Sequence, residues 1–205
     1  MTLLVVYLLL AIGVSFLCSI LEAVLLSVTP GFVVTQAEKY PRRGKVLLDV
    51  KTDLDRSLSS ILILNTFAHT MGAAGVGAQA VKLFGEKWEG AIAFLLTLAS
   101  LYLSEIIPKT LGATFWKQLA LPSAVIIGLL VKLLFPFVWL SAQVTKLFSK
   151  GERGAISREE LTAMARLGAR HGSLRNQESE LLQNILNLRG TRTEDILTPR
   201  TVVTA

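Results

Sequence analysis

Long apolar runs constrain this chain more than any other feature of its sequence. Residues 2–28, 57–83 and 91–108 form three such runs with few charged side chains. A helix needs roughly 20 residues to cross a bilayer, and each run is close to or above that length. Hydrophobic residues make up 52% of the chain and charged residues only 18%, whereas a soluble domain is about 25% charged. The sequence therefore predicts an all-α membrane protein and argues against a soluble globule, a disordered chain and a nucleic-acid-binding domain.

Basic residues between these runs predict the topology. The loop at residues 29–56 carries Lys39, Arg42, Arg43, Lys45, Lys51 and Arg56. Positively charged loops stay in the cytoplasm, so we expect the N-terminus outside. Residues 2–28 are too long for a signal peptide and lack its basic start, so we interpret them as a spanning helix.

The fourth apolar stretch, residues 118–148, has two interpretations. It contains Pro122, Lys132 and Pro136. A lysine near the middle of a span costs roughly 3 kcal/mol on insertion, and proline breaks or kinks a helix. Three spans would leave the hydrophilic tail in the cytoplasm, so we predict three transmembrane helices and two juxtamembrane belt helices, with Lys132 reaching to the interface. A fourth full span is the alternative.

The tail after the apolar stretches is amphipathic and hydrophilic. Ser157 and Glu160 have the spacing of a capping box, and the apolar positions that follow predict two short helices that end near Gly172 and Gly190. We therefore divide the chain into a transmembrane domain (1–150), a small cytosolic helical bundle (151–190) and a linker stub (191–205). The extended end predicts that the chain is a piece of a longer protein.

Each span also carries polar side chains, which are costly in lipid and are therefore candidates for function. The three sets are Ser15, Ser19 and Glu22; Ser59, Ser60, Asn65, Thr66, His69 and Thr70; and Ser100, Ser104 and Glu105.

Pro108 adds a backbone oxygen to the third set. Proline has no N–H, so the carbonyl of Ser104 loses its helical partner and needs another donor, a water or a cation. Hydroxyl, amide, carbonyl and carboxylate oxygens are the ligands of Mg²⁺ or Ca²⁺. A single cysteine, Cys18, and the absence of a histidine pair argue against zinc and copper. Together these features indicate a cation site.

Each of these features also has a purely structural interpretation. The serines could pack closely or bond their own helix, and Asn65 could make an interhelical hydrogen bond. Glu105 and Lys109 are four residues apart and could form a local ion pair, and His69 could be a satisfied core residue. The glycines Gly72, Gly75 and Gly77 are typical of a close-packing face. An intramembrane enzyme that uses serine and His69 lacks a second acid at suitable spacing, so we do not expect an enzyme.

Three motifs resemble those of a known family. They are Ser19-Ile20-Leu21-Glu22 in the first run, Ile63-Leu64-Asn65-Thr66 in the second and Ser104-Glu105-Ile106-Ile107-Pro108-Lys109 in the third. Their order and spacing resemble the CNNM/CorC family of membrane Mg²⁺ transport proteins over residues 1–148. The tail is similar to that family's acidic helical bundle, although its charge is nearly balanced. Leu197-Thr198-Pro199-Arg200 resembles the entry to the family's paired CBS module.

The resemblance implies a homodimer in the plasma (inner) membrane, with one Mg²⁺ per subunit in an inward-facing cavity. By matching position, Ser19, Asn65 and Glu105 are the expected ligands, followed by Ser60 and the carbonyl of Ser104. Glu22 is expected to line the site. Lys109, next to Pro108, is expected to neutralise Glu105 when the site is empty. This chain has serine at position 104, where many members have glycine.

The same resemblance implies a function. We expect a Mg²⁺ transporter that works by alternating access and exchanges Mg²⁺ against Na⁺; the alternative is a membrane sensor that binds Mg²⁺ without moving it. Longer members bind ATP in the CBS module. We do not expect that module within this chain, so we expect no ATP site in it. Membrane lipid is the other expected partner, and nucleic acid is not expected.

Overall fold

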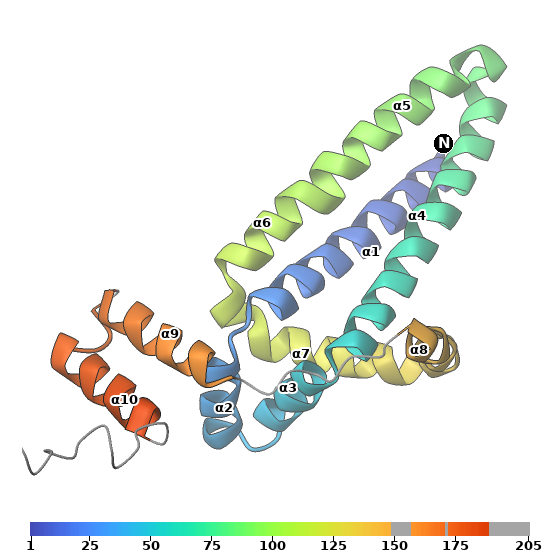
Figure 1. Cartoon of the computed structure of the whole chain (residues 1–205). Coiled ribbons are helices and arrows are strands. Elements are labelled where there is room, and N and C mark those ends of the chain that lie inside the picture. The colour runs from blue at the N-terminus through green and yellow to red at the C-terminus, as the bar shows by residue number, and fades with distance from the viewer. Residues whose placement is uncertain (149–156, 171, 189–205) are drawn as a thin grey trace, which may run out of the picture. The chain divides into compact units, whose positions relative to one another are not determined.

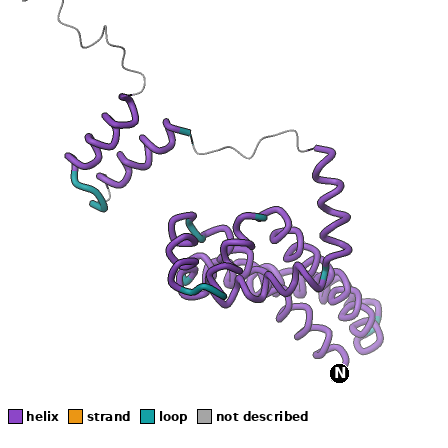
Figure 2. Tube along the Cα trace, turned by 90° about the horizontal axis from the view of Figure 1, so that it is seen from below, coloured by secondary structure: helices purple, strands orange, loops and turns teal. Residues whose placement is uncertain are grey.

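The computed structural model describes residues 1–148, 157–170 and 172–188. The regular elements in these ranges are helices, which confirms the all-α prediction (Figure 2). The chain divides into two compact units, Met1–Ser149 and Lys150–Ala205.

The first unit is built around three long helical segments that lie side by side (Figure 1). Helix α1 covers Thr2–Ser27 and helix α4 covers Leu54–Phe84. The third segment, Glu86–Thr114, returns from the tight turn at Gly85, whose φ is 82°. Glycine adopts this conformation without steric cost. All three segments are long and apolar enough to cross a membrane.

The third segment consists of four consecutive elements without a loop between them. They are the 3₁₀ turn η1 (Glu86–Trp88), α5 (Glu89–Ala99), the π-helix η2 (Ser100–Ile106) and α6 (Ile107–Thr114). The sequence predicts that this run ends at residue 108. The structure corrects this boundary, since the helix continues through Pro108 for six more residues.

Four shorter helices complete the unit at the end of the long segments opposite the Gly85 turn (Figure 1). They are α2 (Pro30–Lys39), α3 (Arg43–Thr52), α7 (Trp116–Leu133) and α8 (Phe135–Phe148), and we call these four the belt helices. Helix α7 also has the length and composition of a span, but it lies across the ends of the three long segments in Figure 1.

The two prolines of this region behave differently. Helix α8 begins next to Pro136, in agreement with the expected break. Pro122 does not break α7 as expected. It lies in the second turn of the helix, where it deprives only the carbonyl of Gln118 of an amide partner.

The core of this unit lies where the end of α1 meets α3, α4 and α7. Its largest buried side chains come from all of these helices and include Leu21, Leu25, Leu47, Ile61 and Ile127. The rest of the long segments exposes many apolar side chains, among them Leu9, Leu62 and Phe94. Lipid tails are the solvent that such a surface requires.

Lys51 ties this core to the end of α1. Its Nζ donates a hydrogen bond of 2.8 Å to the carbonyl of Leu25. That carbonyl belongs to the last turn of α1, where backbone carbonyls have no partner within the helix. Burial lowers the pKa of Lys51 below its ordinary value of 10.5.

The lowered pKa of Lys51 predicts a pH dependence of stability. A lysine whose pKa is lower in the folded protein releases a proton on folding at pH values between that lowered pKa and 10.5. The free energy of unfolding therefore rises with pH in this interval. We expect Lys51→Met to flatten this rise and Lys45→Met, an exposed lysine of the same helix, to leave it intact. Melting temperatures in detergent over a series of pH values up to 10.5 would measure it, and an unchanged slope in Lys51→Met would contradict the assignment.

The second unit contains an antiparallel pair of helices, α9 (Arg158–Arg170) and α10 (Asn176–Leu188). The predicted capping box is confirmed, because Ser157 Oγ accepts from the amide of Glu160 and the Glu160 carboxylate accepts from the amide of Ser157, both at 3.1 Å. Gly172, with φ at 73°, follows α9 as expected. The predicted end at Gly190 and the linker stub at 191–205 lie outside the described residues.

Candidate cation site

The register between α1 and α4 is set by small residues. The position of a Cβ on Gly75 lies 2.7 Å from the ring of Tyr7, and a Cβ on Gly72 would overlap Ala11. Helix α1 leads from the N-terminus toward the end of the unit where α2 and α3 lie, and α4 leads from that end to the Gly85 turn. The two helices are therefore antiparallel (Figure 1). The predicted close-packing face is thus confirmed for Gly72 and Gly75, whereas Gly77 faces open space.

One turn further along both helices, this register brings polar side chains together. Ser15 on α1 lies 2.8 Å from Nε2 of His69 on α4. Four residues beyond Ser15 is Ser19, and four residues before His69 is Asn65. Residues four apart share a helix face, so Ser19 and Asn65 occupy the next level of the same interface.

Ser19 and Asn65 each present an oxygen without a partner. Within the described residues, Ser19 Oγ and Asn65 Oδ1 are buried and have no hydrogen-bond partner. An unpaired buried polar group costs about 1–3 kcal/mol, so such groups in a folded protein call for an explanation such as a water or an ion. These are two of the residues that the sequence motifs single out.

The π-helix η2 brings a carboxylate to the level of Ser15 and His69. Glu105 Oε1 lies 3.6 Å from His69 Nε2. The preceding residue, Ser104, is buried, and its Oγ donates to the carbonyl of Ser100 at 2.7 Å. Through His69, the side chains of α1, α4 and η2 are therefore connected at one level of the bundle.

The π-helix also explains how the third segment passes Pro108. The amide of Ile107 bonds the carbonyl of Tyr102, five residues earlier. A proline ring clashes with the carbonyl four residues before it, which here belongs to Ser104. The wider π turn makes room for this ring, and π turns of this kind are frequent at functional sites.

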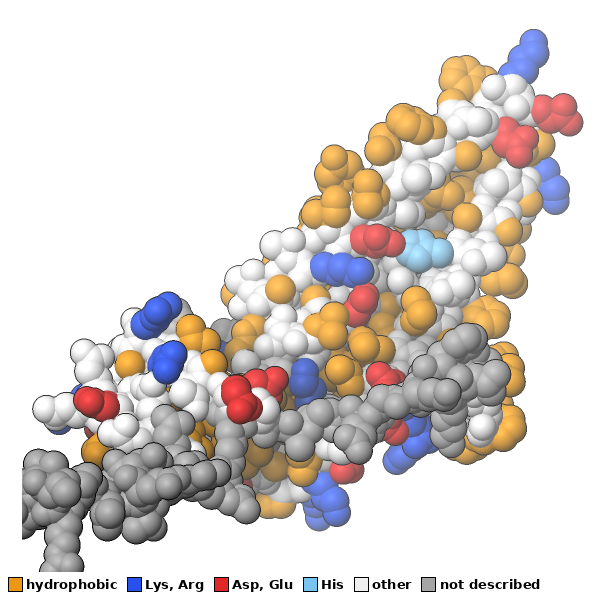
Figure 3. Space-filling view, viewed as in Figure 1, with side chains coloured by type: hydrophobic (Ala, Val, Ile, Leu, Met, Phe, Trp, Pro, Cys, Tyr) orange, Lys and Arg blue, Asp and Glu red, His pale blue; other side chains and the backbone are white. Residues whose placement is uncertain are grey.

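Lys109 pairs across helices. Its Nζ lies 3.2 Å from Oε2 of Glu22 on α1, while Glu105 faces His69. The two carboxylates of the region thus face different basic side chains. Figure 3 shows this group of charged and histidine side chains within a largely hydrophobic and uncharged surface.

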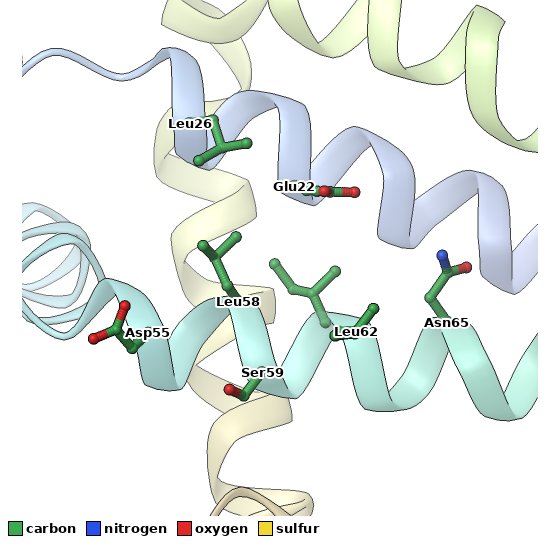
Figure 4. Close-up of a pocket in the computed structure, with 8 residues that line it drawn as sticks. Glu22, Leu26, Asp55, Leu58, Ser59, Leu62 and Asn65 are labelled. Carbon is green, nitrogen blue, oxygen red and sulfur yellow. The ribbon is translucent and has the colours of Figure 1, made fainter. Parts of the chain in front are cut away.

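Two cavities lie along the interface between α1 and α4. We call the one nearer the start of α4 the inner cavity and the one nearer the Gly85 turn the outer cavity. The inner cavity, of about 360 Å³, includes Glu22, Asp55, Ser59 and Asn65 in its lining. Figure 4 shows Glu22 on α1 and Asn65 on α4 at the same space between the two helices. The outer cavity, of about 310 Å³, is lined in part by His69, Thr97, Ser100 and Glu105. Glu22 and Asn65 belong to the inner cavity, and His69 and Glu105 belong to the outer one.

Ser60 is the predicted ligand that stands apart. It is fully buried on α4, and its Oγ donates to the carbonyl of Ser57 at 2.8 Å. It lies five residues before Asn65, toward the belt helices. The inner-cavity lining contains its neighbours Ser59 and Ile61.

Four residues of this region were not among the predicted ligands. Ser15, Ser59 and His69 belong to the polar sets found in the sequence, whereas Asp55 does not. His69 follows Asn65 by four residues in an apolar run, and this spacing was the available signal for its shared face. Its partners could not be read from the sequence, because Ser15 and Glu105 belong to other helices.

The chemistry of this site is that of oxygen ligands. In the described part of the chain, no three His, Cys, Asp or Glu side chains gather as a metal cluster. A cation here would be held by hydroxyl, amide and backbone oxygens together with a carboxylate, which suits a hard cation such as Mg²⁺.

The fold and this intramembrane polar site define an α-helical membrane protein, and comparison with known proteins places it in a family. The family model described as the cyclin M transmembrane N-terminal domain matches residues 6–178. The chain belongs to this family, which confirms the resemblance of its three motifs to CNNM/CorC proteins.

Relatives from bacteria extend this result. The chain is 32% identical over 192 residues to UPF0053 protein sll1254 of Synechocystis, covering 93% of the chain and 55% of that protein. It is 28% identical over 157 residues to UPF0053 inner membrane protein YfjD of Escherichia coli, covering 73% and 36%. It is 24% identical over 184 residues to the Polyamine export protein of Haemophilus influenzae, covering 80% and 42%. The chain spans about half or less of each of these relatives.

Proposed function

We propose that this chain is the membrane part of a Mg²⁺ transporter. The observation that carries the proposal is the pair of unpaired buried oxygens, Ser19 Oγ and Asn65 Oδ1, one turn along the helices from His69, which faces the Glu105 carboxylate. Buried polar atoms in lipid require partners. A dication held by these groups would satisfy all of them at once.

In this proposal Ser19, Asn65 and Glu105 are the first ligands. The carbonyl of Ser104, freed by Pro108, supplies a backbone oxygen. Ser60 keeps its lone pairs available because its hydrogen is donated to Ser57, and it contributes from the belt side. Mg²⁺ binds six oxygens and gives up its waters reluctantly, so the remaining positions keep water.

Glu22 and Lys109 have a supporting role in this scheme. Glu22 lines the inner cavity, where its charge draws a cation toward Asn65. Lys109 balances that charge while the site is empty. Arrival of a dication weakens the attraction between the two side chains, because the cation competes with the ammonium for the carboxylate.

Transport then follows alternating access between the two cavities. We assign the inner cavity to the cytoplasmic side, since it reaches Asp55 near the basic belt helices. The outer cavity, with Thr97 and Ser100, is the exit on the opposite side. His69 stands between them, bound to Ser15 and facing Glu105. The proposal includes three spans with α7 at the interface, the N-terminus outside, a homodimer in the inner membrane and exchange against Na⁺.

Export of polyamines is a second candidate. One relative, from Haemophilus influenzae, is named as a polyamine export protein. In this chain a primary ammonium, that of Lys109, already occupies the carboxylate of Glu22 at 3.2 Å. A linear polyammonium ion could take the place of that ammonium at Glu22 and reach Glu105.

Flux in proteoliposomes tests these functions together. We expect Mg²⁺ uptake that requires Na⁺ on the opposite side, is lost in Glu105→Gln and persists in Glu89→Gln, a control at the outer end of α5. Spermidine flux without Mg²⁺ flux would favour polyamine export. Mg²⁺ binding without flux under any gradient would favour a sensor.

Asn65 offers a test that separates ligand from scaffold. We expect Asn65→Leu to weaken Mg²⁺ binding and yet to raise the free energy of unfolding by about 1 kcal/mol, because it removes an unpaired buried oxygen. The neighbouring Thr66, whose hydroxyl donates to the carbonyl of Leu62 on its own helix, provides the control Thr66→Val. Calorimetry and thermal melting measure the two effects. A loss of both stability and binding would instead make Asn65 a structural residue.

A further inference from the structure

A third cavity lies away from the cation site, among the belt helices. It has a volume of about 470 Å³ and is lined by residues of α3, α4 and α7. These three helices contact one another, and the core residue Val50 forms part of the cavity wall. We call this cavity the belt groove.

The belt groove carries charges of both signs. Asp49 and Asp53 come from the end of α3, Arg56 from the start of α4 and Lys132 from the end of α7. A purely anionic ligand would meet Asp49, and a purely cationic one would meet Arg56 and Lys132. Charge complementarity therefore favours a ligand that carries both charges.

The belt groove also continues into an exposed apolar stripe. Val125 and Leu129 on α7 line it, and Leu133 follows at the same helical spacing. These three side chains are 45%, 64% and 71% exposed. A chain of apolar side chains beside a charged pocket, at the end of a membrane span, suits an amphiphile rather than a soluble metabolite.

We propose that the belt groove binds a zwitterionic aminophospholipid, of the phosphatidylethanolamine class. Its phosphate bonds Arg56 and Lys132, its ammonium donates to Asp49, and one acyl chain lies along Val125 and Leu129. A phosphatidylcholine headgroup has no N–H to donate to a carboxylate, and a phosphatidylglycerol headgroup has no positive charge for it. This site is independent of the proposed cation transport.

Native mass spectrometry of the detergent-solubilised chain tests the site. The probe is an equimolar mixture of phosphatidylethanolamine, phosphatidylglycerol and phosphatidylcholine with identical acyl chains. We expect phosphatidylethanolamine to be retained preferentially. Lys132→Gln should lower that retention about tenfold, since a charge-assisted hydrogen bond is lost. Lys117→Gln, the same change at the other end of α7, should not alter it.

A second variant tests the other end of the headgroup. Asp49→Asn should remove the discrimination against phosphatidylglycerol while keeping overall lipid binding. Lys132 and Asp49 are both exposed, and the melting temperature of each variant confirms that it is folded. Equal retention of the three lipids by the wild type, or preference for phosphatidylglycerol, would overturn the proposal. A Lys132→Gln variant that became a monomer but kept its lipid would also overturn the proposal. That result would assign the groove to a second copy of the chain.

Discussion

Glu105→Gln is expected to abolish Mg²⁺ binding at the intramembrane site. Glutamine keeps the size of the side chain and removes its charge, and Glu105, which faces His69 at 3.6 Å, is the proposed charged ligand. Loss of a residue that merely orients a metal ligand costs roughly 10–100-fold in affinity. We therefore expect a loss of at least about a hundredfold for a charged ligand, measured by calorimetry in detergent.

Glu22→Gln is the matched comparison for this prediction. Glu22 is also a glutamate within the bundle, but its charge is already balanced by Lys109 at 3.2 Å. We expect a clearly smaller loss of affinity, and Glu22→Gln combined with Lys109→Gln should retain binding. A larger loss in Glu22→Gln than in Glu105→Gln would contradict the assignment and place the cation between Glu22 and Asn65, in the inner cavity.

Much of the fold can be predicted from local sequence patterns. Residues 2–28 and 57–83 are predicted as spans and form α1 and α4 with ends shifted by at most three residues. The capping box at Ser157 depends on residues three apart. These features are visible in the sequence because their physical causes, hydrophobicity and capping, lie within one segment.

The contacts of the site are harder to predict, because they join different segments. Glu105 and Lys109 have the spacing of a local ion pair, yet in the structure Glu105 faces His69 and Lys109 faces Glu22. The reason is the register between helices, which depends on how closely their backbones approach. The π-helix adds a second cause, since one wide turn changes the direction of every later side chain.

Gly72→Leu is expected to have the second large effect, through that register. A Cβ at position 72 would overlap Ala11, so any larger side chain pushes α1 and α4 apart. Overpacking of a close contact typically costs about 1–3 kcal/mol. The Ser15–His69 hydrogen bond lies one turn away. We therefore expect a lower melting temperature together with weaker Mg²⁺ binding, although no ligand is changed.

Gly77→Leu separates this effect from the helix propensity of leucine. Both substitutions remove a glycine from the interior of α4, which favours the helix by up to about 1 kcal/mol, but nothing lies within 4 Å of a Cβ at Gly77. This control should leave melting and binding unchanged or slightly improve melting. If Gly72→Leu behaved in the same way, α1 and α4 would not have the register that aligns Ser19 with Asn65.

A swapped pair gives the most specific form of this test. Gly72→Ala alone should destabilise the protein, since even a methyl group meets Ala11. Ala11→Gly removes the opposing methyl group, so the double variant should regain both the melting temperature and the Mg²⁺ affinity. Residues in direct contact show such non-additive effects, whereas distant residues do not. The double variant has one alanine and one glycine at this contact, as the wild type does. If it also regains Mg²⁺ binding, the affinity of the site depends on the distance between α1 and α4.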